Sequence, residues 1–228
     1  MRALRKLVVV TVVLGGLFVA ADRAAVYFAE SEAESRVRTS GGTGSAEITI
    51  GGFPFLTQLA GSRFDRVDVR LDGMETEAAG RSVRVSEVRA RLHDVELGPG
   101  YSGATAARAA GTAVVSYADL TAAAEDAVTV AYGGDGKVKV TGSVEVLGKP
   151  VSRSVLSTVT RGDGGTIKVS ADEVPGEGVP GMEQLVRDRT DFEGAVDGLP
   201  EGLELRAIEA TEKGLEVSVD GTDVSLTG

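Results

Sequence analysis

The sequence predicts an α+β domain in which long, bent antiparallel strands are wrapped around or against helices, preceded by an N-terminal apolar segment. From residue 48 onward, apolar residues recur mostly at every second position, which is typical of antiparallel strands with one buried face. Most of the 31 glycines lie in turn positions between these segments. With 228 residues and 42% hydrophobic content, the chain can bury a core of its own.

The N-terminal segment begins with Arg2, Arg5 and Lys6, which precede the apolar run Leu7–Ala21. Positive charge before an apolar run keeps the N-terminus on the cytoplasmic side and directs the rest of the chain outward. As a helix the run would extend about 22 Å, less than the roughly 30 Å of a bilayer core, a length that also suits a signal peptide cleaved after Ala21. We favour an uncleaved single-pass anchor in the cell membrane; secretion after cleavage is the alternative.

The chain therefore divides into a signal anchor or signal peptide (1–21), a membrane-proximal helix and linker (22–40) and a single α+β domain (41–228). The middle part has no Gly or Pro from Asp22 to Arg38, which predicts a helix. A flexible break is expected over Ser40–Ser45. The helix carries a narrow apolar stripe that suits packing on a sheet, formed by Val26, Ala29, Ala33 and Val37.

Within the domain, the alternation slips at Ser86-Glu87, which predicts a bulge that bends the sheet. Gly133–Lys137 predicts a hairpin turn and not a phosphate-binding loop, because Val138 stands where such a loop needs Ser or Thr. Helical spacing is found at Tyr117–Asp126, which opens with a capping box, and at Met182–Phe192. Strands are expected around 47–50, 66–72, 83–92, 128–132, 137–147, 167–171, 203–205 and 215–219.

Composition argues against several classes of function. The formal net charge of −10 opposes a nucleic-acid partner, because phosphate binding needs a basic face. There is no Cys, and His93 is the single His, at a strand end with no catalytic serine motif elsewhere. Among 34 acidic residues some pair would always suit a glycosidase, so such pairs carry no signal. We expect no catalytic residue, no metal site and no cofactor; a glycan-processing enzyme is the weakest hypothesis.

The most concentrated apolar and aromatic block after the N-terminus is Gly52–Leu59, which follows a strand-like segment and a glycine turn. Pro54 pushes Phe53 toward an extended conformation, and the next five residues predict one or two helical turns. The block is either a hydrophobic plug at the end of the core or a lip that touches an apolar ligand. The residue pattern alone favours the plug, since apolar clusters are usually core.

The same block, Gly-Phe-Pro-Phe-Leu-Thr-Gln at 52–58, resembles the signature of the LmeA-like phospholipid-binding family of actinobacterial cell-envelope proteins. The C-terminal segments 199–203, 214–217 and 224–226 are also similar to that family, so the resemblance covers nearly the whole chain. It implies one elongated, tubular lipid-binding domain behind an N-terminal hydrophobic segment. The strand pattern by itself also fits a half-open barrel or a sandwich.

The resemblance implies a membrane-anchored, extracytoplasmic phospholipid-binding protein that acts in envelope lipid or lipoglycan metabolism without being an enzyme. Two arginines could meet a phosphate headgroup through a bidentate fork, although Asp65 and Asp68 nearby favour ordinary solvated strand charge. The alternative is an envelope structural or interaction domain with a packed core and no ligand; no protein partner is indicated. The expected lipid-binding residues are Phe53, Pro54, Phe55, Leu56, Leu59, Arg63, Phe64 and Arg66.

Overall fold

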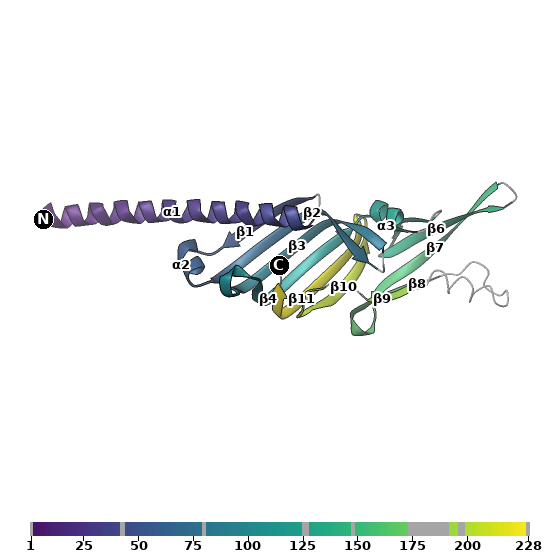
Figure 1. Ribbon diagram of the computed structural model, residues 1–228. Coiled ribbons are helices and arrows are strands. Elements are labelled where there is room, and N and C mark those ends of the chain that lie inside the picture. The colour runs from purple at the N-terminus through teal and green to yellow at the C-terminus, as the bar shows by residue number, and fades with distance from the viewer. Residues whose placement is uncertain are drawn as a thin grey trace.

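The computed structural model describes residues 2–41, 44–78, 81–124, 128–146, 149–172, 192–195 and 199–226. A long helix leads into an elongated body built mainly of strands (Figure 1). The elements are α1 (Arg2–Gly41), β1 (Ser45–Gly51), α2 (Phe55–Ala60), β2 (Arg63–Ala78), β3 (Arg81–Leu97), η1 (Pro99–Tyr101), β4 (Ala104–Val115), α3 (Tyr117–Ala123), β5 (Val128–Gly134), β6 (Lys137–Val146), β7 (Lys149–Arg161), η2 (Asp163–Gly165), β8 (Thr166–Ala171), β9 (Phe192–Ala195), β10 (Leu203–Thr211) and β11 (Gly214–Leu226).

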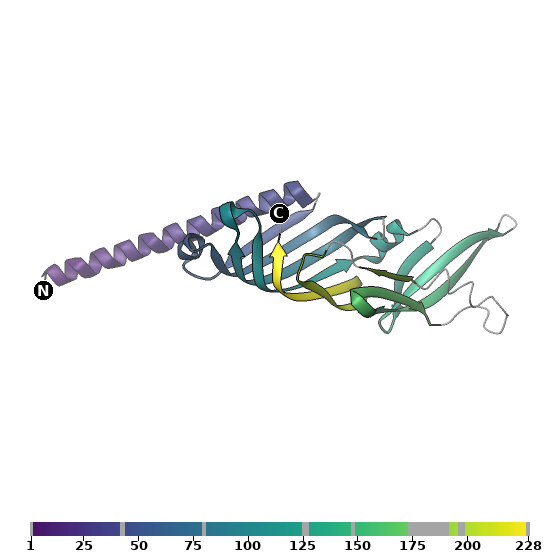
Figure 2. The same ribbon diagram turned by 60° about the horizontal axis from the view of Figure 1, so that its bottom comes forward.

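The strands form two antiparallel sheets, which confirms the predicted α+β class. The first has the order β1-β2-β3-β4-β11-β10, and the second has the order β5-β6-β7-β8-β9. Consecutive strands are neighbours except where β11 pairs with β4, which brings the C-terminal hairpin back to the first sheet. The described strands do not close into a barrel; the second sheet continues the body away from α1 (Figures 1 and 2).

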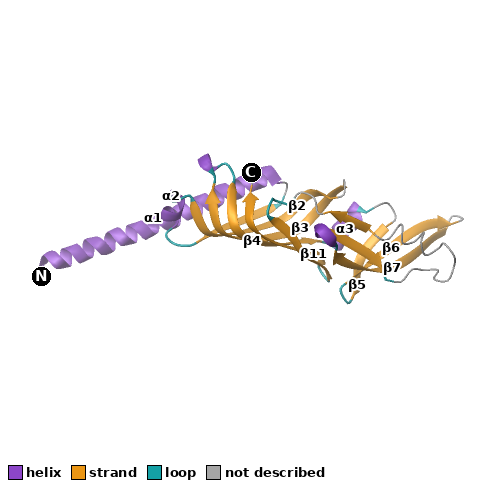
Figure 3. Ribbon diagram, turned by 90° about the horizontal axis from the view of Figure 1, so that it is seen from below, coloured by secondary structure: helices purple, strands orange, loops and turns teal. Residues whose placement is uncertain are grey.

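The N-terminal anchor and the membrane-proximal helix, which we predicted as separate parts, are one continuous helix. α1 passes through Gly15 and Gly16 without interruption and ends at Gly41, so the break expected from Ser40 begins later than predicted. Its second half runs along β1, the edge strand of the first sheet, which is labelled in Figure 1; Figure 3 shows from below how the helix extends beyond the strands. Val26 and Ala29 of the predicted stripe pack against the buried core together with Ala25, whereas Ala33 and Val37, also in the predicted stripe, are half-buried but do not belong to this cluster.

Carboxylates of α1 satisfy the exposed edge of β1. Glu34 accepts a hydrogen bond from the backbone N–H of Ile48 at 3.2 Å, and Glu30 accepts one from Ile50 at 2.7 Å. Residues four apart on a helix lie on one face, and residues two apart on a strand point their N–H groups the same way, so the two repeats match. An edge strand left bare would offer these groups to another chain.

The buried residues form two main clusters at opposite ends of the first sheet. One surrounds α2 and contains Phe55, Phe64, Leu92, Val95, Ala106, Ala109 and Val224. The other joins the two sheets and contains Val138, Val159, Ile208 and Ala210. Each is closed by a short helix: α2 covers the first, and Tyr117 of α3 packs against the second.

The apolar face of the first sheet is continuous, but the alternation of side chains between the two faces is interrupted at two places. Phe64 and Val67 of β2 both join the first cluster although they are three positions apart, and Leu92 and Val95 of β3 match them. Asp94 lies between the latter two with a φ of 52°, which reverses the alternation. Because paired strands slip at matching positions, the register is unchanged.

The slip that we predicted at Ser86-Glu87 is present, but it is two-sided instead of a one-sided bulge. Regular pairing is interrupted between Asp72↔Glu87 and Met74↔Val85, with no shift in register. Gly73, on the opposing strand, has a φ of 72°, and a Cβ there would meet the Arg84 side chain at 2.8 Å. Glycine therefore allows β2 to follow the irregularity in β3.

The predicted local elements are largely confirmed. Ser116 caps α3 by accepting from the Asp119 N–H at 3.1 Å, although the helix ends at Ala123, earlier than expected. The hairpin turn between β5 and β6 is present, with positive φ at Gly134, Asp135 and Gly136. The helix predicted over Met182–Phe192 lies outside the described residues except at Phe192. There the prediction is wrong, because Phe192 begins strand β9 and pairs with Val169 of β8.

Candidate lipid-binding site

The apolar face of the first sheet can be followed across all six strands through the pairing register. Its middle is lined by two rows of residues, each contributed by neighbouring strands. The first row is Ile48, Val69, Ala90, Gly111, Val219 and Leu205; the second is Ala46, Leu71, Val88, Ala113, Val217 and Ile208. The row positions on the outermost strands are buried, whereas those on the inner strands are half-buried.

We call six of the half-buried residues the apolar band: Val69, Leu71, Val88, Ala90, Ala113 and Val219. Within the described residues the band belongs to neither main core cluster, although it connects the sheet region of one with that of the other. Half-burial of an aliphatic row in a sheet centre means that part of its surface is free to contact something else. The band is therefore the part of the domain best suited to an apolar ligand.

Strand β4 makes the centre of this face low. Before Val115, its residues on the apolar face are all small: Ala104, Ala106, Ala109, Gly111 and Ala113. The neighbouring strands place larger side chains beside them, Val88 on β3 and Val217 and Val219 on β11. The side chains of β4 are thus shorter than the aliphatic side chains of β3 and β11 on either side of it. The sequence contained this signal, alternate small residues over 104–113, but our prediction did not use it.

The expected lip residues are divided between core and surface. Phe55 is 1% exposed and Phe64 6%, and their rings stack with centroids 5.9 Å apart. Leu56 and Leu59 are half-buried and pack against the same cluster. Pro54 is half-buried, whereas Phe53 is 58% exposed. The α2 segment thus acts mainly as the plug that the residue pattern favoured, and Phe53 alone projects from it.

A buried carboxylate on α1 holds α2 in place. Asp22 is fully buried, and its Oδ1 accepts a hydrogen bond from the backbone N–H of Leu56 at 2.8 Å. Its other oxygen pairs with Arg23 at 2.7 Å, and the Arg23 guanidinium lies 5.3 Å from the centre of the Phe53 ring. We did not predict this role for Asp22; the available signal was one acidic residue directly after a long apolar run.

Arg63 and Arg66 lie on the opposite face of β2 from the aromatic core. Each alternates with an apolar neighbour, Phe64 or Val67, whose side chain joins the first cluster. Arg63 forms an ion pair with Glu96, and Arg66 pairs with Asp68 at 2.9 Å. The structure therefore does not bring these two arginines to the apolar band or to Phe55, and both have carboxylate partners.

The polar face of the same sheet carries an open hollow of about 630 Å³. Its lining includes the band residues Val69, Ala90 and Val219 as well as many charged side chains. Two of the latter, Arg70 and Arg89, pair with Glu87 beside the hollow, at 2.7 Å and 2.6 Å. Arg91 pairs with Asp68 at 2.7 Å in the same region. Burying acyl chains against these charges would be costly, so this hollow does not fit a lipid tail.

The titratable groups with shifted pKa values serve structure. Burial and the nearby Tyr132 raise the pKa of Tyr117, whose hydroxyl donates to the Thr211 carbonyl at 2.7 Å. Hydrogen bonds from Thr158 and Lys137 lower the pKa of Asp172. His93 is half-buried on β3, beside Arg66 and Arg108. Among the described residues no group of three His, Asp or Glu is arranged to hold a metal ion.

The structure combines an α+β domain that carries a half-buried apolar band with an N-terminal helix long and apolar enough to cross a membrane. The chain belongs to the LmeA-like phospholipid-binding family, whose model matches residues 20–220. This agrees with the resemblance seen at residues 52–58 and supports phospholipid binding. No curated protein and no solved structure matched the chain.

Proposed function

We propose that this protein is anchored in the cytoplasmic membrane by α1 and holds phospholipid acyl chains on the apolar band outside the cytoplasm. Its role would be to carry or present lipid in cell-envelope lipid or lipoglycan metabolism, without chemistry of its own. The observation that carries the proposal is the half-buried band between two core clusters in a member of a phospholipid-binding family.

The energetics of the band suit this role. Each CH₂ group moved from water onto an apolar surface contributes about 0.8 kcal/mol, so an acyl chain that contacts the band along about ten methylenes gains roughly 8 kcal/mol before the cost of association. Valine, leucine and alanine side chains of the band carry no polar atoms that would compete. The low centre along β4 suits an extended chain lying parallel to that strand.

Two separate arguments support membrane anchoring by α1 and a role without catalysis. A single helix contains both the basic N-terminus and Asp22, so an uncleaved α1 would join the membrane rigidly to the domain. The shifted groups Tyr117 and Asp172 are bonded to structural partners, and neither faces a nucleophile–base arrangement in the described residues. Both arguments support a binding protein.

The test uses the full chain in phospholipid vesicles that contain a lipid with a photoactivatable group on one acyl chain. After illumination, cross-linked peptides are mapped by mass spectrometry. We expect cross-links on the β2, β3 and β4 segments that carry the band. Ala113→Trp, which raises the low centre of the apolar face, should reduce them about tenfold. Thr112→Trp, on the adjacent residue of the opposite face, is the matched control and should leave them unchanged.

The alternative function is a structural or interaction domain of the envelope with a packed interior. The deep burial of Phe55 and Phe64 favours it at one end of the sheet, because that end has no room for a ligand. Cross-links confined to α1, with equal yields in Ala113→Trp and Thr112→Trp, would support this alternative and contradict lipid binding on the band.

A further inference from the structure

The α2 end of the body lies against α1 close to the apolar run of that helix. The Asp22–Leu56 hydrogen bond places α2 beside residue 22, one position after Leu7–Ala21 ends. In Figures 1 and 2, α2 is the part of the body nearest the N-terminal half of α1. If α1 crosses a bilayer, α2 therefore meets the membrane first.

The length of the apolar run of α1 determines how deep α2 lies relative to the bilayer. Leu7–Ala21 reaches about 22 Å as a helix, whereas a bilayer core is roughly 30 Å thick. Twenty residues are needed to span it, which extends the membrane segment from Leu7 to about Val26. Residues 22–26 are then in the outermost part of the hydrocarbon core, next to the interface, and α2, bonded to Asp22, is at a similar depth.

The residues at this depth fit an interface. Tyr27 is 67% exposed, Phe28 70% and Phe53 58%; with Leu156, these are the large hydrophobic residues exposed in the described chain after Ala21. Exposed aromatic residues gather where membrane helices leave the bilayer. Tyr27 and Phe28 contact each other edge to face and Phe53 lies under Arg23 of α1, so the exposed faces of all three belong to residues on or beside this part of α1.

Charge is sparse along the chain in the same region, although the exposed side chains of Arg66 and Asp65 reach Gly51 and Gly52. Residues 48–62, from β1 through α2, contain no charged side chain, in a protein of which 25% is charged. Asp22 is fully buried under α2, and its partner Arg23 is long enough to reach headgroups while it lies over Phe53. The cost of bringing this end of the body into the interface is therefore low.

We propose that the tip of the body, formed by Phe53, α2 and residues 22–28 of α1, is embedded in the outer surface of the phospholipid bilayer. This rests on the proposed membrane anchoring and names the docking surface and its partner. The apolar face of the first sheet then begins at the bilayer, because the cluster around α2 leads directly to the apolar band.

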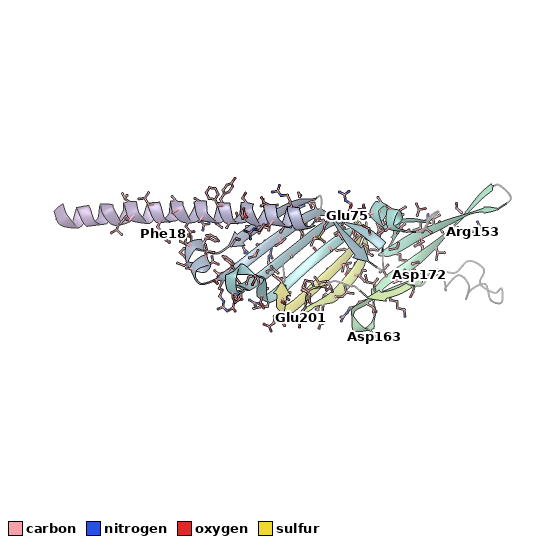
Figure 4. The ribbon with its side chains drawn as sticks, viewed as in Figure 1. Phe18, Glu75, Arg153, Asp163, Asp172 and Glu201 are labelled. Carbon is pink, nitrogen blue, oxygen red and sulfur yellow. The ribbon has the colours of Figure 1, made fainter. Side chains whose placement is uncertain are left out.

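The test exploits the lack of cysteine in the natural sequence. Single-cysteine variants of the full chain carry a spin label at Thr57 or Ala60, both exposed on α2, and are reconstituted in phosphatidylcholine–phosphatidylglycerol vesicles. Collision rates with oxygen, which partitions into lipid, and with a water-soluble nickel complex report the depth of each label. Arg153→Cys, at the far end of the body, is the water-exposed control, and Ala24→Cys is the reference on α1 (Figure 4).

We expect labels at Thr57 and Ala60 to collide with oxygen at least tenfold more, relative to nickel, than the label at Arg153, and to match the depth of Ala24 within one helical turn. Labels on α2 that are as open to nickel as the one at Arg153 would overturn the docking of the tip. Cross-linking of lipid to the band is measured separately, so a tip in water together with cross-links on the band would reject this inference and leave the proposed function standing.

Discussion

Glu30 Oε1 lies 2.7 Å from the backbone nitrogen of Ile50, so a side chain of the long helix closes the edge of the sheet. Glu34 does the same for Ile48, one helical turn further along α1. Both interactions join residues that are far apart in the sequence, and both lie in the part of α1 beyond the proposed membrane segment. The helix is therefore a component of the domain as well as its proposed anchor.

Replacing Glu30 with Ala should lower the free energy of unfolding by about 1 kcal/mol, because the Ile50 N–H would lose its partner at a half-buried edge. Unfolding of the full chain by urea in mild detergent, followed by circular dichroism, measures this loss. Glu32→Ala is the matched control. Glu32 is exposed and pairs only along the helix with Arg36, so its removal should cost less than about 0.5 kcal/mol. Equal losses in the two variants would contradict the edge contact.

Because Phe55 is buried and Phe53 is exposed, replacing them should lower the free energy of unfolding by different amounts. Phe55→Ala should destabilise the fold by about 3–5 kcal/mol, because it removes a fully buried ring stacked on Phe64. Phe53→Ala should cost about 1 kcal/mol or less, since that ring is mostly exposed and contacts Arg23. Thermal unfolding of both variants under one condition checks the order. A larger loss at Phe53 would mean that the plug has been assigned to the wrong residue.

Tyr117 connects α3 to the end of β10 through its bond to the Thr211 carbonyl. Tyr117→Phe should cost about 1 kcal/mol at neutral pH, the usual contribution of such a hydrogen bond. Because burial raises the pKa of Tyr117 in the folded state, the unfolded chain ionises first, and the stability that Tyr117 contributes falls as the pH rises above its ordinary value of 10.0.

The difference in unfolding free energy between the natural protein and Tyr117→Phe should therefore shrink between neutral and strongly alkaline pH. Urea unfolding at pH 7 and above pH 10 measures it. Tyr132→Phe is the comparison variant, since Tyr132 lies 6.4 Å from Tyr117 between ring centroids but donates no bond to Thr211. A difference that grows with pH would show that the pKa of Tyr117 is not raised.

Asp172 carries a prediction for acid conditions. Thr158 donates to its Oδ1 at 2.6 Å and Lys137 pairs with its Oδ2 at 2.9 Å, and these contacts hold its pKa below the ordinary 3.8. The stability that they contribute is complete above pH 3.8 and is lost as the pH falls through the lowered pKa. Asp172→Asn should thus be less stable than the natural protein at pH 7, and the difference should shrink as the pH falls below 3.8. A gap that is undiminished at pH 2 would mean that the charge of Asp172 is not involved.

Much of the fold could be predicted because its signal is local. Alternation of apolar residues identified most of the strands, and the capping residue Ser116 and the glycine turn at Gly133–Lys137 marked elements that the structure confirms. The burial of Phe55 followed from its place in an apolar block. Which face the side chains point to on either side of Asp94 and Gly73 could not be predicted. An irregularity in one strand is tolerated only where the paired strand has a matching one, and the sequence does not show which strands pair.

The candidate site was predicted less completely, for a related reason. The lip block was found, but its role as a plug depends on Asp22, which lies 34 positions before Leu56 in the sequence. Arg63 and Arg66 were placed beside the lip by sequence distance, whereas strand alternation turns them to the other face. The apolar band combines residues from β2, β3, β4 and β11, and only the order of the strands in the sheet brings them together.

The sequence by itself determined that the chain has a basic-flanked apolar helix, an acidic strand-rich domain and the signature of a phospholipid-binding family, because each of these depends on residues close together in the chain. The tertiary structure alone decided that α1 closes the edge of β1, that α2 is fastened to Asp22, and that small residues of β4 lie between two aliphatic flanks. Those features depend on pairing between distant segments, and the free energy of such pairing is decided by the packed sheet as a whole.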